Sequence, residues 1–232
     1  VFEAGARRIG YRDITTSHIA INSVPYDGRP ACTQIGFCTT GCAIGAKWST
    51  LYTEIPKAES TGHFELRPKS MAVRIVHDRR GRVTGVVYRS ADGALHQQKA
   101  RAICVAGNAV ETTRLLMFSE STAFPDGVAN SSGHLGRNYM RHMNQWVSAI
   151  MPGPVHSHKS ARQAGFIRDE HPHDPSRGFA GGYLLELRGG TPELFAKYAG
   201  WGTHAQRWME SFTHLAGMGM SGEDPPQSDN RI

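Results

Sequence analysis

The sequence of 232 residues lacks any apolar run long enough to cross a bilayer: its longest, around residues 103–106, falls far short of the roughly 20 residues required. It also lacks a clustered basic face, although 26 Lys and Arg against 20 Asp and Glu give a net charge of +6. Scattered charges of both signs argue against nucleic-acid binding. There is no initial Met and no signal peptide at the start, so we expect an internal piece of a longer protein.

The composition is that of a globular protein with a packed core, with 39% hydrophobic residues, 26 Gly and 12 Pro. Histidine is frequent, and two His-x-His pairs lie among Pro, Gly, Ser and Asp residues. Neither pair has a third ligand at metal-binding spacing, so we interpret them as solvated loop residues. The pairs are His156 with His158 and His171 with His173.

Local patterns predict a mixed α/β chain. A short amphipathic helix ends at Gly10, and a second helix starts near residue 49 and stops at Gly62. Turns at residues 78–81 and 91–93 separate strand candidates and predict a β-meander. These candidates cover residues 64–67 continuing into 71–77, 82–90 and 94–98.

A strand, a glycine turn and a helix are predicted in succession at residues 102–119. Residues 102–106 form an apolar run typical of a strand buried on both faces of a parallel sheet, with Cys104 as a small hydrophobic residue in it. Gly107 ends the run, and apolar residues from Ala109 onward recur at helical spacing. Backbone N–H groups at such a turn point at anionic ligands, but many α/β proteins contain this unit.

The last third of the chain predicts two further helices. One starts at Thr191-Pro192 and is closed by Gly200; the other covers residues 204–216. Residues 217–222 match G-x-G-x-x-G, but they follow a helical pattern and run into Glu-Asp-Pro-Pro. This context cannot open the helix that a pyrophosphate needs, so we reject the match as a nucleotide motif.

Three of the four cysteines, Cys32, Cys38 and Cys42, form a C-x5-C-x3-C cluster in a loop rich in Gly and Thr. Structural zinc is disfavoured, because it normally takes four ligands and C-x2-C pairs. Three thiolates suit an iron–sulfur cluster, since soft sulfur ligands favour such clusters. A disulfide plus one free thiol, or three packed thiols, remain the alternatives.

Several segments together resemble the middle of a glucose-methanol-choline (GMC) flavoprotein oxidoreductase. The resemblance runs over nearly the whole chain in the family's order, and its most specific element is the glycine turn with the helix after it. The segments are residues 38–47 (CTTGCAIGAK), 81–86 (GRVTGV), 105–116 (VAGNAVETTRLL), 136–142 (GRNYMRH) and 222–231 (GEDPPQSDNR).

The resemblance implies part of an FAD-binding, Rossmann-like domain with a β-meander over residues 1–145. Part of an antiparallel-sheet α+β substrate-binding domain would follow over residues 146–232. The N-terminal dinucleotide motif and the C-terminal catalytic His pair of the family have no counterpart here, so we expect no catalytic residue in this chain and no activity from it alone. His142 falls in a family motif, where we expect a structural role.

The same resemblance implies where the cofactors bind. Ala72 and Val73 would lie by the adenine of FAD, and Gly107, Asn108 and Ala109 would lie on the flavin side. Within the family, the cysteine loop is similar to that of bacterial glucose, fructose and gluconate dehydrogenases, in which three cysteines hold a 3Fe-4S cluster. Cys32, Cys38 and Cys42 would be its ligands here.

The expected activity is FAD-dependent oxidation of the CH-OH group of a sugar, sugar acid or other alcohol by hydride transfer to flavin. Electrons would pass to an acceptor such as a cytochrome c subunit, with a small chaperone-like subunit as a second partner and a periplasmic location. The alternatives are an oxygen-using alcohol oxidase of the same family and a degenerate, non-catalytic interaction module.

Overall fold

The computed structural model describes residues 2–159, 161, 163–189, 196–197 and 199–232. The chain divides into two compact units, which are described separately. Unit 1 comprises Val1–His63 and Arg141–Pro225, and unit 2 comprises Phe64–Met140 and Pro226–Ile232. We predicted a boundary near residue 145 between a cofactor-binding and a substrate-binding domain. The division into two compact units does not test these roles, so the boundary stays a prediction.

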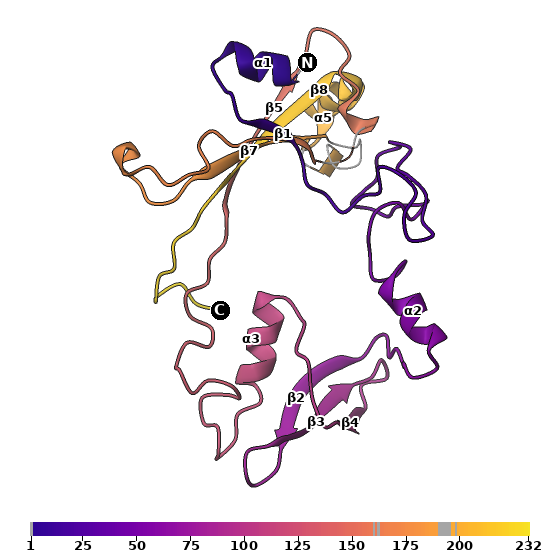
Figure 1. Ribbon diagram of the computed structural model, residues 1–232, viewed down its shortest axis with the longest axis vertical. Coiled ribbons are helices and arrows are strands. Elements are labelled where there is room, and N and C mark those ends of the chain that lie inside the picture. The colour runs from indigo at the N-terminus through magenta and orange to yellow at the C-terminus, as the bar shows by residue number, and fades with distance from the viewer. Residues whose placement is uncertain (1, 160, 162, 190–195, 198) are drawn as a thin grey trace. The chain divides into compact units, whose positions relative to one another are not determined.

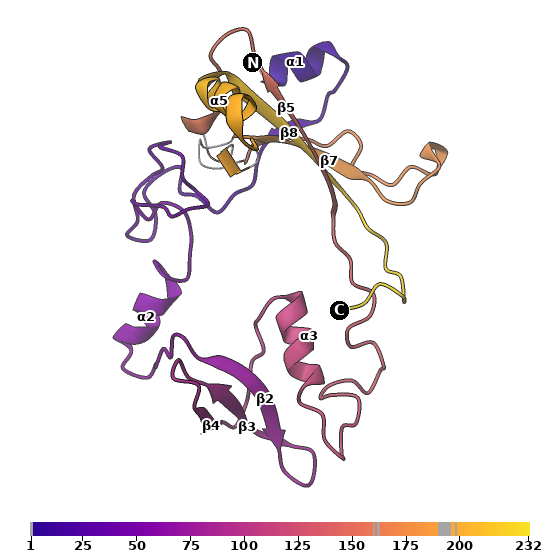
Figure 2. The same cartoon turned by 180° about the vertical axis from the view of Figure 1, so that it is seen from behind.

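Unit 1 is built on a five-stranded antiparallel sheet in the order β1-β6-β7-β8-β5 (Figure 1). Strand β5 is an edge strand, and all eight of its residues are exposed. Helix α5 lies beside β8 in both views (Figures 1 and 2). The strands are β1 (Ile14–Thr16), β5 (Met143–Ile150), β6 (Gln163–Ile167), β7 (Tyr183–Arg188) and β8 (Leu215–Gly222). The described residues of unit 1 include the α-helices α1 (Phe2–Arg8), α2 (Glu54–Ser60) and α5 (Gly202–Glu210).

The two faces of this sheet differ in chemistry, because side chains alternate along each strand. The apolar residues Val147, Met218 and Leu185 share one face by their register. The other face carries Trp146 and Glu186, on either side of Gly219. Three short 3-10 turns also lie among the residues of unit 1 that the structure describes: η1 (Ser157–Lys159), η2 (Pro175–Arg177) and η3 (Phe212–His214).

Unit 2 contains the predicted meander as a three-stranded antiparallel sheet, β2 (Met71–His77), β3 (Val83–Arg89) and β4 (Leu95–Lys99). Helix α3 (Ala109–Met117) packs on β2. The buried hydroxyl of Ser119 joins them: it accepts from the Ile75 N–H at 2.8 Å and donates to the Leu115 carbonyl at 2.6 Å. The meander and the helix after the glycine turn are therefore confirmed.

The strand predicted at residues 102–106 is wrong, because these residues form no regular element and pair with no strand in the described chain. A strand buried on both faces needs neighbours to cover it. Cys104 is accordingly exposed and is not the core residue that we predicted. The antiparallel sheets confirm a mixed α/β chain, while the Rossmann-like detail stays a prediction.

Other boundaries differ from the predictions. Helix α2 starts only at Glu54, and residues 64–67 form no strand. The helix predicted over residues 204–216 ends as α5 at Glu210, and residues 215–222 form strand β8. The G-x-G-x-x-G match thus lies within a strand. The helix predicted from Thr191 lies mostly outside the described residues. No helix that the structure describes is long and apolar enough to span a membrane.

Candidate functional site

The glycine turn at residues 107–108 opens helix α3 with a capped N-terminus. The side-chain oxygen of Asn108 accepts from the Glu111 N–H at 2.8 Å, as an N-cap residue does. Gly107 lies close to the first turn, where a Cβ added to it would be 3.1 Å from Thr112 Oγ1. Any side chain at residue 107 therefore has to displace Thr112. The three residues that we predicted to contact the flavin are all exposed: Gly107, Asn108 and Ala109.

The second predicted cofactor segment lies in strand β2, beside α3. Ala72 pairs with Tyr88 and Arg74 with Val87, so Val73 is the extra residue of a β-bulge. A bulge redirects a side chain and interrupts the ladder, and bulges are frequent next to active sites. Ala72 and Val73 are both half-buried. Both predicted FAD segments thus belong to unit 2, while their contact with the cofactor stays a prediction.

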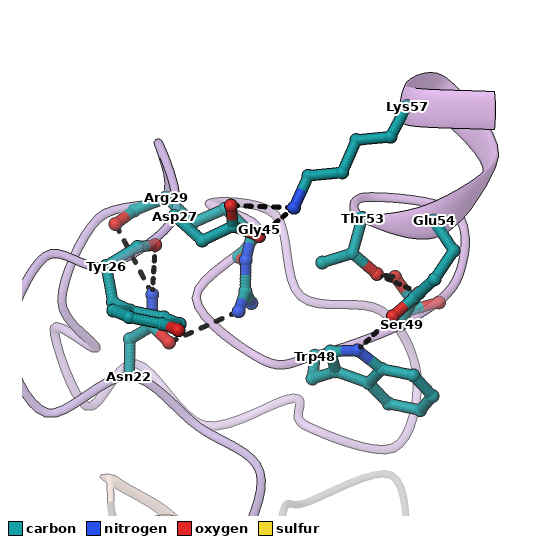
Figure 3. A network of polar contacts seen from close by, with 10 residues as sticks. All are labelled: Asn22, Tyr26, Asp27, Arg29, Gly45, Trp48, Ser49, Thr53, Glu54 and Lys57. Atoms are coloured by element: carbon teal, nitrogen blue, oxygen red, sulfur yellow. Dashed lines mark hydrogen bonds and ion pairs between the residues drawn. The ribbon is translucent and has the colours of Figure 1, made fainter. Parts of the chain in front are cut away.

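The cysteine loop of unit 1 is held by Arg29 (Figure 3). Its Nη1 donates to the carbonyls of Gly45 and Ala46 at 3.2 and 3.3 Å, and its Nη2 donates to Asn22 Oδ1 at 3.3 Å. Beside it, Lys57 and Asp27 form an ion pair at 2.7 Å. Sequence reasoning missed Arg29, and no local motif marks it. The guanidinium fixes the backbone on the C-terminal side of Cys42.

That backbone directs N–H groups at the Cys42 sulfur. The Lys47 N–H donates to Sγ at 3.4 Å. Burial by itself raises the pKa of the Cys42 thiol, but hydrogen bonds from the backbone of residues 44–47 outweigh burial and lower its pKa overall. The loop therefore stabilises a thiolate at Cys42, the form that binds metals.

The three thiols are not gathered at one point. Cys32, Cys38 and Cys42 are all free and half-buried. Among the described residues, no three His, Cys, Asp or Glu side chains are arranged to hold a metal ion. Lys47 connects two of the cysteine positions, since its Nζ donates to the Cys38 carbonyl at 2.7 Å. This arrangement does not support a 3Fe-4S cluster at the three cysteines.

Three of the four histidines in the two His-x-His pairs are solvent-exposed, as we predicted, and one is not. His156, His171 and His173 are exposed. His158 is half-buried, with its ring centroid 4.9 Å from that of Phe212. Burial, followed by the nearby His156 and Lys159, lowers the pKa of His158 and favours its neutral form.

A polar cluster on the sheet of unit 1 is a feature that the sequence analysis missed. The buried carboxylate of Glu186 accepts hydrogen bonds from Gln163, Arg188 and Ser221. The Arg188 guanidinium also stacks on the Trp146 ring at 4.0 Å. A signal was present: Glu186 and Arg188 are two residues apart in an apolar strand, and so lie on one face.

Comparison with known proteins gives a consistent family. The sequence model of the protein family described as "GMC oxidoreductase" matches residues 2–144. Fructose dehydrogenase large subunit of Gluconobacter japonicus is 37% identical over 136 residues, which is 59% of this chain and 25% of that protein. 2-Methyl-1,2-propanediol dehydrogenase of Mycolicibacterium austroafricanum is 29% identical over 224 residues, 92% of this chain and 40% of that protein.

An oxidase is similar as well. Paromamine 6'-oxidase of Streptomyces fradiae is 32% identical over 156 residues, which is 66% of this chain and 28% of that protein. The chain thus spans between a quarter and two fifths of the length of these curated relatives. The matched family region contains the cysteine loop, the meander and the glycine turn.

Proposed function

Because the chain belongs to the GMC oxidoreductase family, whose model covers residues 2–144, we propose that it is part of an FAD-dependent dehydrogenase. The enzyme oxidises the CH-OH group of a sugar, sugar acid or other alcohol. The relatives' names cover fructose, 2-methyl-1,2-propanediol and paromamine, so the family match alone supports no single substrate.

The observation that carries this proposal is the glycine turn at the capped start of α3. Residue 107 presents only its backbone to a cofactor, since a Cβ added there would lie 3.1 Å from Thr112 Oγ1 and crowd it. Exposed backbone at a glycine turn permits close approach by a cofactor. The residues present therefore fit a bound flavin group, with Gly107, Asn108 and Ala109 on its flavin side.

Ala72 and Val73 complete the proposed FAD site at its adenine side. Val73 is redirected by the bulge, and Ala72 is small and half-buried. FAD, when bound, supplies the hydride acceptor; the protein holds and orients it. We assign no catalytic residue within residues 1–232.

The acceptor that we propose is a cytochrome c subunit rather than oxygen, with a small chaperone-like subunit as a second partner in the periplasm. The support is the similarity to fructose dehydrogenase large subunit, which is named as one subunit of a larger assembly. The N–H groups around Cys42 suit a thiolate ligand, but the three sulfurs are not brought together. We therefore derive no electron transfer through a 3Fe-4S cluster.

Anaerobic titration of the full-length protein tests the proposal. We expect the oxidised flavin absorbance to bleach with at least one of D-fructose, D-glucose, D-gluconate or 2-methyl-1,2-propanediol. Cytochrome c should then restore the absorbance faster than oxygen. No bound flavin, or no bleaching by any of these compounds, would refute the proposed function; faster reoxidation by oxygen would indicate the oxidase instead.

The same preparation tests the cysteine loop. Iron and acid-labile sulfide in near-equal amounts, both lost in Cys38→Ser with FAD retained, would support the cluster. Their absence under strict anaerobic purification would exclude it without affecting the flavin chemistry.

A further inference from the structure

Basic residues that are scattered along the sequence gather in one part of unit 2. Residues 64–101, which contain the β-meander, include nine Lys and Arg against three Asp and Glu. Their net charge of +6 equals that of the whole chain, because the basic and acidic residues outside this segment are equal in number. The net positive charge of the chain therefore belongs to the meander segment.

The strand register collects part of this charge on one face of the sheet, because residues paired across strands share a face. Arg89 pairs with Met71 on one side and with Leu95 on the other. The register, which the structure describes for all three strands, places no Asp or Glu on this face. The face, here called the meander face, carries Met71, Arg74, Val87, Arg89, Leu95 and Lys99.

The three cations of the meander face are exposed and not neutralised. Arg74, Arg89 and Lys99 are all solvent-exposed. In the part of the chain that the structure describes, none of them forms an ion pair with a carboxylate. Arg74 donates to the backbone carbonyl of Glu120 at 2.8 Å, and this neutral acceptor leaves its charge in place.

Two exposed apolar side chains accompany these cations. Met71 is 50% exposed and Leu95 is 59% exposed, and they flank Arg89 in the register. The opposite face of the sheet carries Ile75, which is only 3% exposed, so the meander face is the outward face within unit 2. Cations beside apolar side chains are the combination with which interfacial helices bind anionic membranes.

The size of the meander face favours a membrane over a protein partner. Three strands about 4.8 Å apart, with a rise of about 3.4 Å over each of five residues, cover roughly 250 Å². A stable protein complex needs about 800 Å² from each partner. The register also places no aromatic residue of the three described strands on this face, although aromatic side chains dominate protein interfaces.

We propose that the meander face binds the surface of an anionic membrane. Arg74, Arg89 and Lys99 contact the lipid phosphates, and Met71 and Leu95 enter the boundary between headgroups and acyl chains. The site lies wholly within unit 2 and goes beyond the proposed oxidation of alcohols. A few cations give weak, reversible binding, which orients the protein on a membrane without anchoring it.

The test is co-sedimentation of the full-length protein with vesicles of phosphatidylglycerol and phosphatidylcholine in equal parts. Vesicles of phosphatidylcholine alone are the neutral reference. The double variant Arg89→Gln/Lys99→Gln removes two cations from the meander face. The matched control Arg8→Gln/Arg12→Gln removes two exposed cations of unit 1 and changes the net charge equally.

We expect the wild type to bind the anionic vesicles and not the neutral ones. Each Lys or Arg near an anionic surface contributes a factor of about 5 to the partition coefficient, so Arg89→Gln/Lys99→Gln should lower it about 25-fold. The control pair should lower it by less than about 2-fold, because only charges within a Debye length of the membrane contribute. If the double variant fails to fold, Lys99→Gln alone on the exposed strand β4 should lower it about 5-fold.

Three results would overturn the proposal: no binding of the wild type to anionic vesicles, equal binding to neutral vesicles, or an equal loss in the two pairs of variants. An acidic protein as the true partner of the meander face predicts the first of these. Sedimentation does not depend on turnover, so failure here leaves the proposed function standing.

Discussion

Substitution of Gly107 separates a cofactor-binding glycine from one that only packs. Its φ lies outside the left-handed region, so a side chain there meets no strain from a positive φ, and space alone limits the residue. A Cβ would meet Thr112 Oγ1 at 3.1 Å and Thr112 N at 3.4 Å. The first contact requires Thr112 to shift, whereas the second is close to ordinary van der Waals separation.

The expected loss in the free energy of unfolding follows from these contacts. Gly107→Ala should destabilise the full-length protein by about 1 kcal/mol, the low end for overpacking, because a single side-chain oxygen has to move. Gly107→Val adds two methyl groups in the same space and should reach about 3 kcal/mol. Thr112→Ala removes the obstructing oxygen, so the double variant Gly107→Ala/Thr112→Ala should recover most of the stability lost in Gly107→Ala, measured against Thr112→Ala alone.

Flavin content decides between the two roles. Urea unfolding measures stability, and visible absorbance per protein measures bound flavin. If the cofactor approaches the backbone at Gly107, the double variant recovers stability while its flavin content stays low. Recovery of full flavin content together with stability would refute the reasoning and leave Gly107 as a packing residue of helix α3.

Two further predictions concern the framework of each unit. Ser119→Ala should cost about 1 to 3 kcal/mol in urea unfolding, because the buried N–H of Ile75 loses its acceptor; a loss within error would show that this bond contributes nothing net. Burial raises the pKa of Glu186, but hydrogen bonds from Gln163, Arg188 and Ser221 outweigh it and lower the pKa overall. Glu186 therefore contributes stability above its unfolded pKa of about 4.3, and this stability is lost as pH falls through the lower folded pKa. Unfolding of Glu186→Gln should consequently depend less on pH below about pH 4.3 than that of the wild type, and equal slopes would contradict this.

The sequence predicted the elements whose signals are local. The meander is marked by turns with glycine at residues 81 and 93, both with positive φ, and helix α3 by apolar residues that recur at helical spacing after Gly107. Strand β8 escaped prediction because it contains three glycines and no β-branched residue, so that pairing with β5 and β7 determines its conformation. The apolar run at residues 102–106 gave a wrong strand prediction for the opposite reason. Its composition favours a strand, but it has no pairing partner among the described residues.

The candidate site shows the same division. Residues 72–73 and 107–109 could be named from a family motif, and the structure adds the bulge at Val73 and the crowding at Gly107. Arg29 lies 16 and 17 residues from the two carbonyls that it holds, and the Glu186 network joins three strands. Contacts between residues so distant in sequence depend on the fold and have no pattern in a single sequence.

The central claim is that residues 72–73 and 107–109 hold FAD, and an experimental structure of the full-length protein with its flavin tests it most directly. The account predicts the adenine beside Ala72 and Val73, and the flavin side of the cofactor in contact with the backbone of Gly107, Asn108 and Ala109. A structure in which other protein segments cover both of these sites, with FAD bound elsewhere or absent from a fully active enzyme, would contradict it.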